Sequence, residues 1–430
     1  MGLGEQLTIT QKLRKIRKSK GIKQMRFAEI LHWDVSRISE IETGRRHYCD
    51  KQLTKLRAFL EIEDAPVTDD ELVKFKRRLY VWRDLIRDRR INEAENLRKE
   101  LAVISKLPYE KDLNLLYKMF EISQLLRQDD VNDNLQFMAE ALDETEPFLD
   151  EASEETKHHF YCNKGLLCYY RDEHEKSTTY YKAAISTEDD GYEKEPTVYY
   201  NLALAYSHMG MAVRALSIIL DSYNLFDHHR TSIIGLRIDN TLAVNYIRTN
   251  QIGLALKVLD RAVDKASSLA DKTFLDITLH NYGAAYFQAG DYEKALQYFN
   301  EAFEHIDKNN SLYLENYFAK VHTLITIKNK ALYSPLLLKA KTVARANEHY
   351  TLLFDSLSHA LTAKELRSVE FIENITLPYL VNNYQYSRAL YFCNVLIEAH
   401  DRSKRSKRVL EIKGLKADIL EKIMFGSDNI

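Results

Sequence analysis

The sequence is poor in the residues that make tight turns. Its 430 residues include 13 Gly and 6 Pro, about a third of the share found in average proteins. Sandwiches, barrels and doubly wound sheets need a turn signal roughly every 8–12 residues, and this chain cannot supply so many. The scarcity excludes those classes and favours an all-α protein.

Cysteines and long apolar runs are also scarce. The four cysteines, Cys49, Cys162, Cys168 and Cys393, form no CxxC pair, which is typical of a reduced cytoplasmic protein rather than a disulfide framework. No apolar run approaches the roughly 18 residues of a spanning helix, and the first residues lack the pattern of a signal peptide. We therefore expect a cytoplasmic protein without a membrane segment.

Motifs of catalysis and cofactor binding are missing as well. There is no P-loop, no GxGxxG after a strand and no HExxH, so we expect neither an enzyme nor a cofactor. The pairs His158–His159 and His228–His229 are adjacent, so their rings point apart on a helix and make poor metal sites. We expect no metal site. The basic run Arg402–Arg408 is interpreted as a solvated helix end, with a phosphate contact as the alternative.

Charge is divided unevenly along the chain. Residues 1–60 hold 14 Lys/Arg and 6 Asp/Glu, a net charge of +8, whereas the remaining residues hold 47 and 57, a net charge of −10. A basic head on an acidic body indicates that the head meets an anion and the body does not. The alternative is a solvated basic helix face.

Apolar spacing divides the head into short helices. It predicts four of them, at residues 9–20, 24–31, 34–42 and 50–60. The second and third meet at a tight turn, His32–Trp33, after which Asp34 can cap the third helix. Two short helices about a tight turn, flanked by two others, predict a helix-turn-helix domain.

The run from Gly21 to Arg46 resembles the Cro/Xre-type helix-turn-helix. It has Gln24 at the second helix start, the small Ala28 where two helices cross, and the ending ISEIETG at Ile38–Gly44. The resemblance implies binding to double-stranded DNA, and it places the following residues at the interface: Gln24, Val35, Ser36, Arg37, Glu40, Arg45 and Arg46. A protein-binding domain of the same fold is the alternative.

The resemblance assigns these residues different roles. Ser36 and Arg37 would reach base edges in the major groove, while Gln24, Arg45 and Arg46 would meet phosphates. Glu40 departs from the family pattern, where the position is often neutral or basic. It is left open whether Glu40 accepts from a cytosine amine, pairs with Arg37 or repels the DNA backbone.

A boundary near residue 66 separates the head from the body. The segment Glu61–Asp70 is acidic, contains Pro66 and lacks apolar periodicity. Thr68 and Glu71 then form a capping box that opens a new helix. We therefore assign residues 1–65 to the DNA-binding domain and residues 67–430 to a second domain.

The body repeats itself with a period near 40 residues. A small residue recurs in the first helix of each copy, at Gly165, Ala203, Ala243 and Gly283. A second small residue follows twelve positions later, at Ser177, Ala215, Ala255 and Ala295, and a large one four positions after that, at Tyr181, Ile219, Leu259 and Phe299. A last small residue comes three positions further on, at Ala184, Ser222, Ala262 and Ala302. The pattern resembles the tetratricopeptide repeat.

Weaker copies extend the pattern toward both ends of the body. Residues 89–101 and 382–399 are each interpreted as the turn and second helix of a repeat, and Pro335 and Pro378 as irregular joins. We expect seven to nine helical hairpins in a right-handed superhelix with a concave inner surface.

Polar residues of the first helices point to a peptide site on that concave wall. An Asn amide offers both a donor and an acceptor, so a ladder of amides can grip a peptide backbone, and an Arg can take its carboxylate. The candidate residues are Asn163, Asn201, Asn240, Asn281, Tyr200, Arg237, Arg248 and His280, with His208 and Gln288 nearby. The alternative is that these Asn residues bridge neighbouring repeats and bind no peptide.

Head and body together resemble the RRNPP family of peptide-sensing regulators, with length and layout most similar to its NprR and PlcR branch. The resemblance implies a dimeric cytoplasmic quorum-sensing transcription factor, switched by a short signalling peptide in the repeat groove. The alternative is a Rap-like regulator that docks a response regulator and promotes its dephosphorylation. Because Rap heads lack a basic recognition helix and this head has Arg37, Arg45 and Arg46, the first hypothesis is favoured.

Overall fold

In the computed structural model, the chain is helical wherever regular structure is described, and no strand occurs there. The described residues are 14, 17–18, 20–43, 56, 69–88, 90–104, 111–127, 131–189, 194–225, 233–269, 271–306 and 311–425. The all-α prediction is confirmed. No helix in these ranges is both long and apolar enough to cross a membrane. The chain divides into two compact units, residues 1–84 with 92–117, and residues 85–91 with 118–430.

The first unit contains the two short helices predicted from the sequence. Helix α2 (Gln24–Leu31) and helix α3 (Val35–Glu42) are joined by the three residues His32, Trp33 and Asp34. Asp34 occupies the N-cap position of α3, as predicted, but its side chain makes no capping hydrogen bond. The predicted flanking helices and the boundary near residue 66 lie almost entirely outside the described residues.

Two longer helices follow, and most of their residues belong to the same unit. Helix α5 (Asp69–Arg87) begins one residue after Thr68, as the capping box predicts, although Thr68 itself is not among the described residues. Helix α6 (Ile91–Ile104) is joined to α5 by an ion pair between Arg78 and Glu100. The predicted second helix at residues 89–101 is therefore confirmed.

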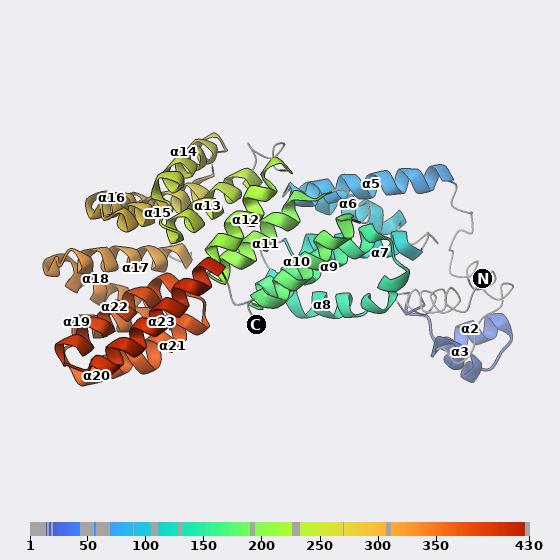
Figure 1. Ribbon diagram of the computed structural model, residues 1–430. Coiled ribbons are helices and arrows are strands. Elements are labelled where there is room, and N and C mark those ends of the chain that lie inside the picture. Colours follow the sequence, from blue (N-terminus) through green and yellow to red (C-terminus); the bar gives the residue numbers. More distant parts are fainter. Residues whose placement is uncertain are drawn as a thin grey trace. The chain divides into compact units, whose positions relative to one another are not determined.

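The body is a succession of antiparallel helix pairs (Figure 1). After α7 (Lys111–Leu125) and α8 (Val131–Asp143), a short 3₁₀ turn, η1 (Glu146–Glu151), leads into the repeats. The pairs are α9 (Glu154–Tyr170) with α10 (His174–Asp189), α11 (Pro196–His208) with α12 (Ala212–Asp221), α13 (Ile233–Arg248) with α14 (Ile252–Ser268), α15 (Lys272–Ala289) with α16 (Tyr292–His305), and α17 (Ser311–Thr326) with α18 (Lys330–Val343).

The small and large residues of the repeat pattern pack as the sequence predicts. A Cβ placed on Gly165 would lie 2.7 Å from the Tyr181 ring, and one on Gly283 would lie 2.4 Å from the Phe299 ring. The large residue of each second helix therefore fills the space that the first helix leaves empty. The twelve other repeat positions named above, from Ala203 to Ala302, are at most 4% exposed.

The last part of the body is less regular. Helix α19 (Glu348–Leu361) precedes a broken helix made of α20 (Leu366–Phe371), a π-helical segment η4 (Ile372–Thr376) and α21 (Leu377–Asn382). Pro378 is the second residue of α21 and lies two residues after the π-helical segment, so its assignment to an irregular join is confirmed. Pro335 lies inside α18, so the corresponding prediction for Pro335 is wrong.

The final hairpin is also assigned differently from the sequence-based prediction. Helix α22 (Tyr386–Arg402) packs more extensively against α23 (Ser406–Phe425) than against α21. It is therefore the first helix of the last pair, not the second helix of the preceding one. Residues 403–405 join these two helices, and the whole run 402–408 is exposed, which confirms a solvated helix end.

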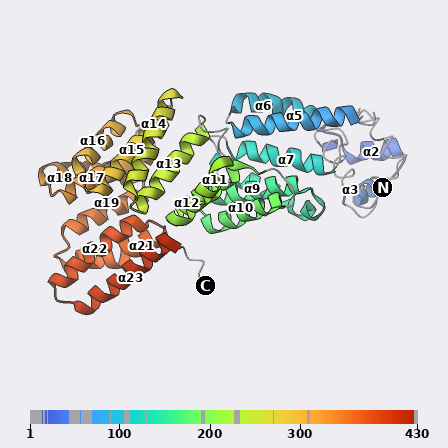
Figure 2. The ribbon, with the colours of Figure 1, turned by 45° about the horizontal axis from the view of Figure 1, so that its top comes forward.

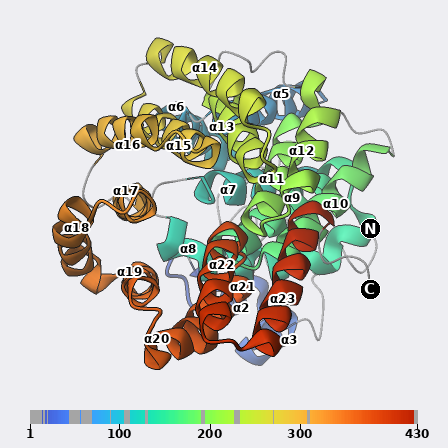
Figure 3. The same ribbon diagram turned by 60° about the vertical axis from the view of Figure 1, so that its left-hand side comes forward.

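The helix pairs curve so that one helix of each pair lies on the inside. Figure 3 shows α13, α15, α17 and α19 on the inner side, and α14, α16, α18 and α20 on the outer side. The curve brings α23 against α12 (Figure 2). Tyr386 meets Gly210 there, and the Tyr384 hydroxyl donates to Glu175 at 3.3 Å. Segments about two hundred residues apart therefore touch across the stack.

Candidate functional site

The packing of α2 against α3 decides which residues of the head are available to a partner. Phe27, Ala28, Ile38 and Ile41 are at most 3% exposed and form one cluster. Phe27 and Ala28 are adjacent on α2, and Ile38 and Ile41 are three residues apart on α3. One face of each helix is therefore buried. The opposite face of α3 is thereby held toward solvent.

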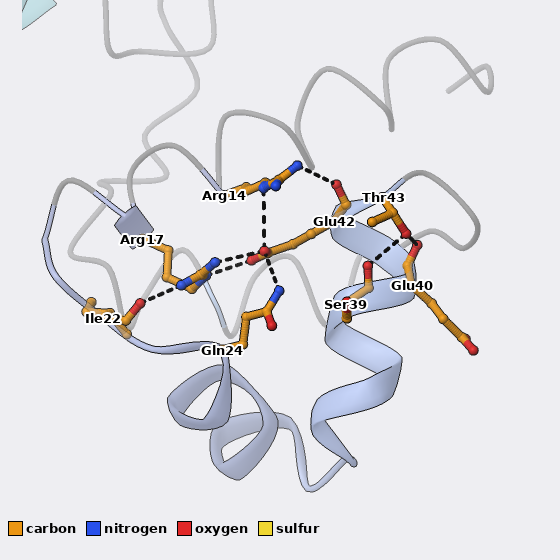
Figure 4. A network of polar contacts seen from close by, with 8 residues as sticks. All are labelled: Arg14, Arg17, Ile22, Gln24, Ser39, Glu40, Glu42 and Thr43. Carbon is orange, nitrogen blue, oxygen red and sulfur yellow. Dashed lines mark hydrogen bonds and ion pairs between the residues drawn. The ribbon is translucent and has the colours of Figure 1, made fainter.

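A buried carboxylate fixes the end of α3 (Figure 4). Glu42 is 5% exposed and accepts hydrogen bonds from Arg17 Nε and Nη2 at 2.6 and 2.8 Å and from Gln24 Nε2 at 2.8 Å. Arg14 also donates to the Glu42 carbonyl at 3.2 Å. Burial raises the pKa of Glu42, but the bonds from Arg17 and Gln24 outweigh burial and hold the pKa below its ordinary value. The acid therefore stays ionised as a clamp.

The predicted DNA-reading residues lie on the exposed face of α3. Val35, Ser36 and Arg37 are exposed, while Glu40 is half-buried and its side chain extends away from the Glu42 clamp (Figure 4). The Arg37 guanidinium lies 4.0 Å from the centre of the Trp33 ring, which orients it by a cation–π contact. Four of the seven predicted interface residues are therefore brought to one helix face.

The other three predicted residues fare differently. Gln24 begins α2 as predicted, but its amide donates to Glu42 inside the head. Gln24 therefore helps to hold the Glu42 carboxylate in place. Arg45 and Arg46 lie outside the described residues. Glu42, which sequence reasoning treated as part of the family ending, is the organising residue of the head.

The inner wall of the body is held together by side-chain hydrogen bonds between successive repeats. Asn240 and Thr278 share a bond of 3.1 Å, and Asn281 donates to Asn240 at 2.8 Å. Asn245 donates to Ser207 at 3.0 Å. Because these partners are 38–41 residues apart, each bond joins one first helix to the next.

Three of the four predicted peptide-gripping Asn residues belong to this bridging set. Asn163, Asn240 and Asn281 are at most 6% exposed, and Asn163 donates to the Met119 carbonyl at 2.8 Å. For these three residues the structure shows the arrangement that was the alternative, because their amides are bonded to protein groups in the interior. That they grip a peptide stays a prediction. Asn201 differs: it is half-buried and, in the part of the chain that the structure describes, its amide makes no side-chain hydrogen bond.

Charged side chains from distant repeats gather on the inner wall. Arg248 on α13 is half-buried and donates to the Ser207 carbonyl at 2.5 Å. Arg388 on α22 pairs with Glu315 on α17, which also accepts from the Tyr350 hydroxyl at 2.8 Å. Glu315 and Arg388 are separated by 73 residues, so no local sequence pattern connects them.

The pKa values in this cluster describe a poorly hydrated, positively charged wall. Burial, together with the charge of Arg388, lowers the pKa of Arg248 to about 10. Burial acts to raise the pKa of Glu315, but Arg388 and His280 outweigh it and lower the pKa to about 2. Two arginines thus face one carboxylate, an arrangement that favours an additional anion.

The remaining predicted wall residues are partly committed to protein contacts. Tyr200 is 9% exposed. Arg237 is half-buried, with its guanidinium 5.3 Å from the centre of the Phe274 ring, and His280 Nδ1 donates to Asn316 Oδ1 at 2.9 Å. Asn245, Glu315 and Arg388 were missed by sequence reasoning, because nothing local marks which residues face the inside of a curved stack.

The adjacent histidines pack against different neighbours, although their ring centres lie only 5.4 Å apart. The rings of His158 and His159 are 89° apart. His158 lies against Ala184 and Thr187, whereas His159 packs against the Phe120 ring with centroids 4.8 Å apart. They do not form a site with each other. His228 and His229 lie outside the described residues.

Known proteins match this chain in sequence. The tetratricopeptide repeat family matches residues 236–308. "Response regulator aspartate phosphatase A" of Bacillus subtilis (strain 168) is 24% identical over 371 residues, covering 77% of this chain and 95% of that protein. Phosphatase H of the same organism is 23% identical over 231 residues, covering 51% and 61%.

Solved structures match the fold. A Rap protein complexed with Competence and Sporulation Factor has a TM-score of 0.68 at 16% identity, covering 81% of this chain and 98% of that one. The apo quorum sensor NprR from B. thuringiensis has a TM-score of 0.66 at 21% identity, covering 81% and 99%. The tetratricopeptide-repeat fold predicted from the sequence, and its resemblance to this group of proteins, are confirmed.

Proposed function

Since the chain has the fold and repeat architecture of the RRNPP peptide sensors, we propose that it is a transcriptional regulator switched by a short signalling peptide. The head binds double-stranded operator DNA, and the concave side of the repeats binds the peptide. A single short helix reads few bases, so two heads of a homodimer read two half-sites. The likeness in fold supports the peptide part of this proposal.

The DNA-binding part is carried by one observation, the exposed face of α3. Val35, Ser36 and Arg37 face solvent while Ile38 and Ile41 are buried. An Arg oriented by an aromatic ring suits the two-pronged contact with guanine that specifies sequence. The Glu42 clamp keeps the helix from shifting under that contact.

Substitution of Arg37 tests this part. Arg37→Ala should abolish preference for a selected duplex over random DNA, because each such base contact contributes about 1–3 kcal/mol of discrimination. Arg45→Ala should weaken binding to all duplexes alike and reduce the salt slope by about one. Fluorescence anisotropy titrations at several salt concentrations would measure both effects.

An Arg outside the head provides the control. Arg405→Ala removes an exposed charge from the loop between α22 and α23 and should leave DNA binding unchanged. Equal losses for Arg405→Ala and Arg37→Ala would refute the assignment of α3 as the reading helix, and would favour the basic run 402–408 instead.

The peptide part is supported by the inner-wall cluster and by Asn201. The amide of Asn201 can still donate to and accept from a peptide group. Arg248 and Arg388 supply two positive charges near the single negative charge of Glu315. A peptide carboxylate placed there would restore charge balance in a poorly hydrated setting. The structure thus favours a peptide that is anchored by one end and gripped along its backbone.

Peptide binding is tested at these two points. Arg248→Met should weaken binding of the cognate peptide at least tenfold by calorimetry, since a hydrogen bond to a charged group contributes about 1.5–3 kcal/mol. Asn201→Ala should weaken it by about tenfold, since a neutral hydrogen bond contributes about 0.5–1.5 kcal/mol and the amide can make two. Asn163→Ala is the contrast, because that amide is buried against Met119 and its loss should lower stability rather than peptide affinity. Unchanged affinity in both Asn201→Ala and Arg248→Met would refute the groove assignment.

A second candidate function is docking of a response regulator with promotion of its dephosphorylation. The two Bacillus subtilis relatives are named response regulator aspartate phosphatases. The full-length Arg37→Ala variant separates the two candidates, because a docking activity would survive this change and operator binding would not. Loss of a phosphorylated response regulator's label in the presence of the chain would measure the docking activity directly.

A further inference from the structure

A histidine, a cysteine and a glutamate converge on one point at the start of the repeats. Their ligand atoms, one each from His158, Cys162 and Glu195, all lie within 4.8 Å of one another. His158 and Cys162 are four residues apart on α9 and so share one helix face. Glu195 is the N-cap residue of α11, so the cluster joins two repeats.

The distance between two of the ligand atoms fits a tetrahedral metal ion. His158 Nε2 and Glu195 Oε2 are 3.4 Å apart. With zinc–nitrogen and zinc–oxygen bonds of about 2.0–2.1 Å at the tetrahedral angle, the two atoms would be roughly 3.3 Å apart. An ion can therefore enter between them without moving either side chain far.

The other nitrogen of His158 is arranged as in metal-bound histidines. His158 is fully buried, and its Nδ1 lies 3.0 Å from the Ala184 carbonyl and 3.1 Å from Thr187 Oγ1. A carbonyl can only accept, so Nδ1 carries a proton. Nε2 faces the Glu195 carboxylate, and a bound metal ion would take the place of any proton that Nε2 carries. Metal-ligating histidines almost always donate their second ring nitrogen in this way, usually to a carbonyl or carboxylate.

We propose that His158, Cys162 and Glu195 form a Zn²⁺ site that links helix α9 to the first turn of α11. Imidazole, thiolate and carboxylate are the ligand types of zinc, and three protein ligands leave a fourth position for water. Cys162 and Glu195 are partly exposed, which provides a path for the ion. Because α11 carries Asn201, the metal would fix the start of a helix that we assign to the peptide site.

Cobalt substitution of the full chain tests this proposal. Chelator-treated protein titrated with Co²⁺ alone should develop a thiolate-to-cobalt charge-transfer band and strong visible bands of a four-coordinate ion, saturating at one equivalent, and Zn²⁺ should remove them. Cys162→Ser should abolish the charge-transfer band and weaken Zn²⁺ binding by about 100-fold or more. Glu195→Gln should retain the band with binding weaker by an order of magnitude or more, because a neutral amide replaces a carboxylate ligand.

Cys168 provides a matched control, because it lies on the same helix and outside the cluster. Cys168→Ala should bind Co²⁺ as the unchanged protein does. Absence of the band in protein that is folded by circular dichroism would overturn the proposal, as would equal Zn²⁺ affinity with and without Cys162, or loss of the band in Cys168→Ala.

A second measurement applies if Cys162→Ser does not fold. Alkylation of Cys162 in the unchanged chain, followed by peptide mass spectrometry, should be slowed at least tenfold by Zn²⁺, while alkylation of Cys393 should not change. Equal alkylation rates of Cys162 with and without Zn²⁺ would refute the site. The failure of either test would leave the DNA-binding and peptide-binding proposals untouched, because neither assay involves those ligands.

Discussion

Substitution of Gly283 by Ala places the packing rule of the repeats under a direct test. The new Cβ would lie 2.4 Å from the Phe299 ring, whereas carbon atoms in contact are about 3.5–4.0 Å apart. The ring must therefore retreat by roughly 1 Å or more, and Phe299 is 1% exposed with no open side. Overpacking of this kind costs about 1–3 kcal/mol, and the tight site places the cost near the upper end.

An opposing gain reduces the net effect. Ala is more favourable than Gly inside a helix by about 1 kcal/mol, so Gly283→Ala should lower the free energy of unfolding by about 2 kcal/mol. Gly414→Ala is the matched control, because Gly414 also lies inside a helix and no atom of a neighbouring residue stands within 4 Å of the place its Cβ would take. That variant should be more stable by about 1 kcal/mol. Urea unfolding followed by circular dichroism would compare the midpoints.

A double-mutant cycle separates the clash from other effects. In a Phe299→Leu background the ring is gone, so Gly283→Ala should become neutral or stabilising, with a coupling of about 2 kcal/mol. If Gly283→Ala were as stabilising as Gly414→Ala in the original background, the small residue would not be required by the large one, and the reasoning would be refuted.

Two further predictions concern the head and the closure of the body. The pKa of Glu42 is lower in the folded state than in the unfolded state. The clamp's contribution to stability is therefore complete above the unfolded pKa near 4.5 and is lost as pH falls through the folded value. Glu42→Gln leaves Arg17 without its counter-charge, so it should remove that pH dependence and speed hydrogen exchange of α2 and α3 at pH 7. Gly210 has φ +70° and its Cβ would lie 2.4 Å from Tyr386, the first residue of α22. Gly210→Ala should therefore push the turn before α12 away from the last helix pair and raise the radius of gyration in X-ray scattering. Gly290→Ala, with φ +82° and no neighbour within 4 Å, should not, and equal scattering from the two variants would contradict the closure contact.

The sequence predicted the repeats well because the relevant signals are local. A helical hairpin brings together residues twelve to nineteen positions apart, so small and large residues at fixed spacing report directly on contacts such as Tyr181 with Gly165. The same holds for α2 and α3, whose bounds follow from apolar spacing and a turn. Pro335 was misassigned because a proline is expected to end a helix. It is the sixth residue of α18, beyond the first turn where proline fits best, and the helix nevertheless continues through it.

The polar residues of the inner wall were harder to assign because an Asn can serve two purposes. Asn163, Asn201 and Asn281 occupy equivalent repeat positions, yet Asn163 and Asn281 bond protein groups and Asn201 remains half-buried. Which role applies depends on the residue that the neighbouring repeat presents. That information lies 38–44 residues away and is not contained in the repeat pattern itself.

The amino-acid sequence alone determined the all-α class, the position of the two short helices and the repeat spacing, because helices and hairpins are set by neighbours along the chain. Only the tertiary structure decided that Glu315 meets Arg388, that Tyr386 closes on Gly210 and that Glu195 joins His158 and Cys162. Each of these contacts depends on how one repeat packs against the next, or on the curvature that many stacked repeats add up to. Curvature is a sum of small rotations at every interface, and no short stretch of sequence records it.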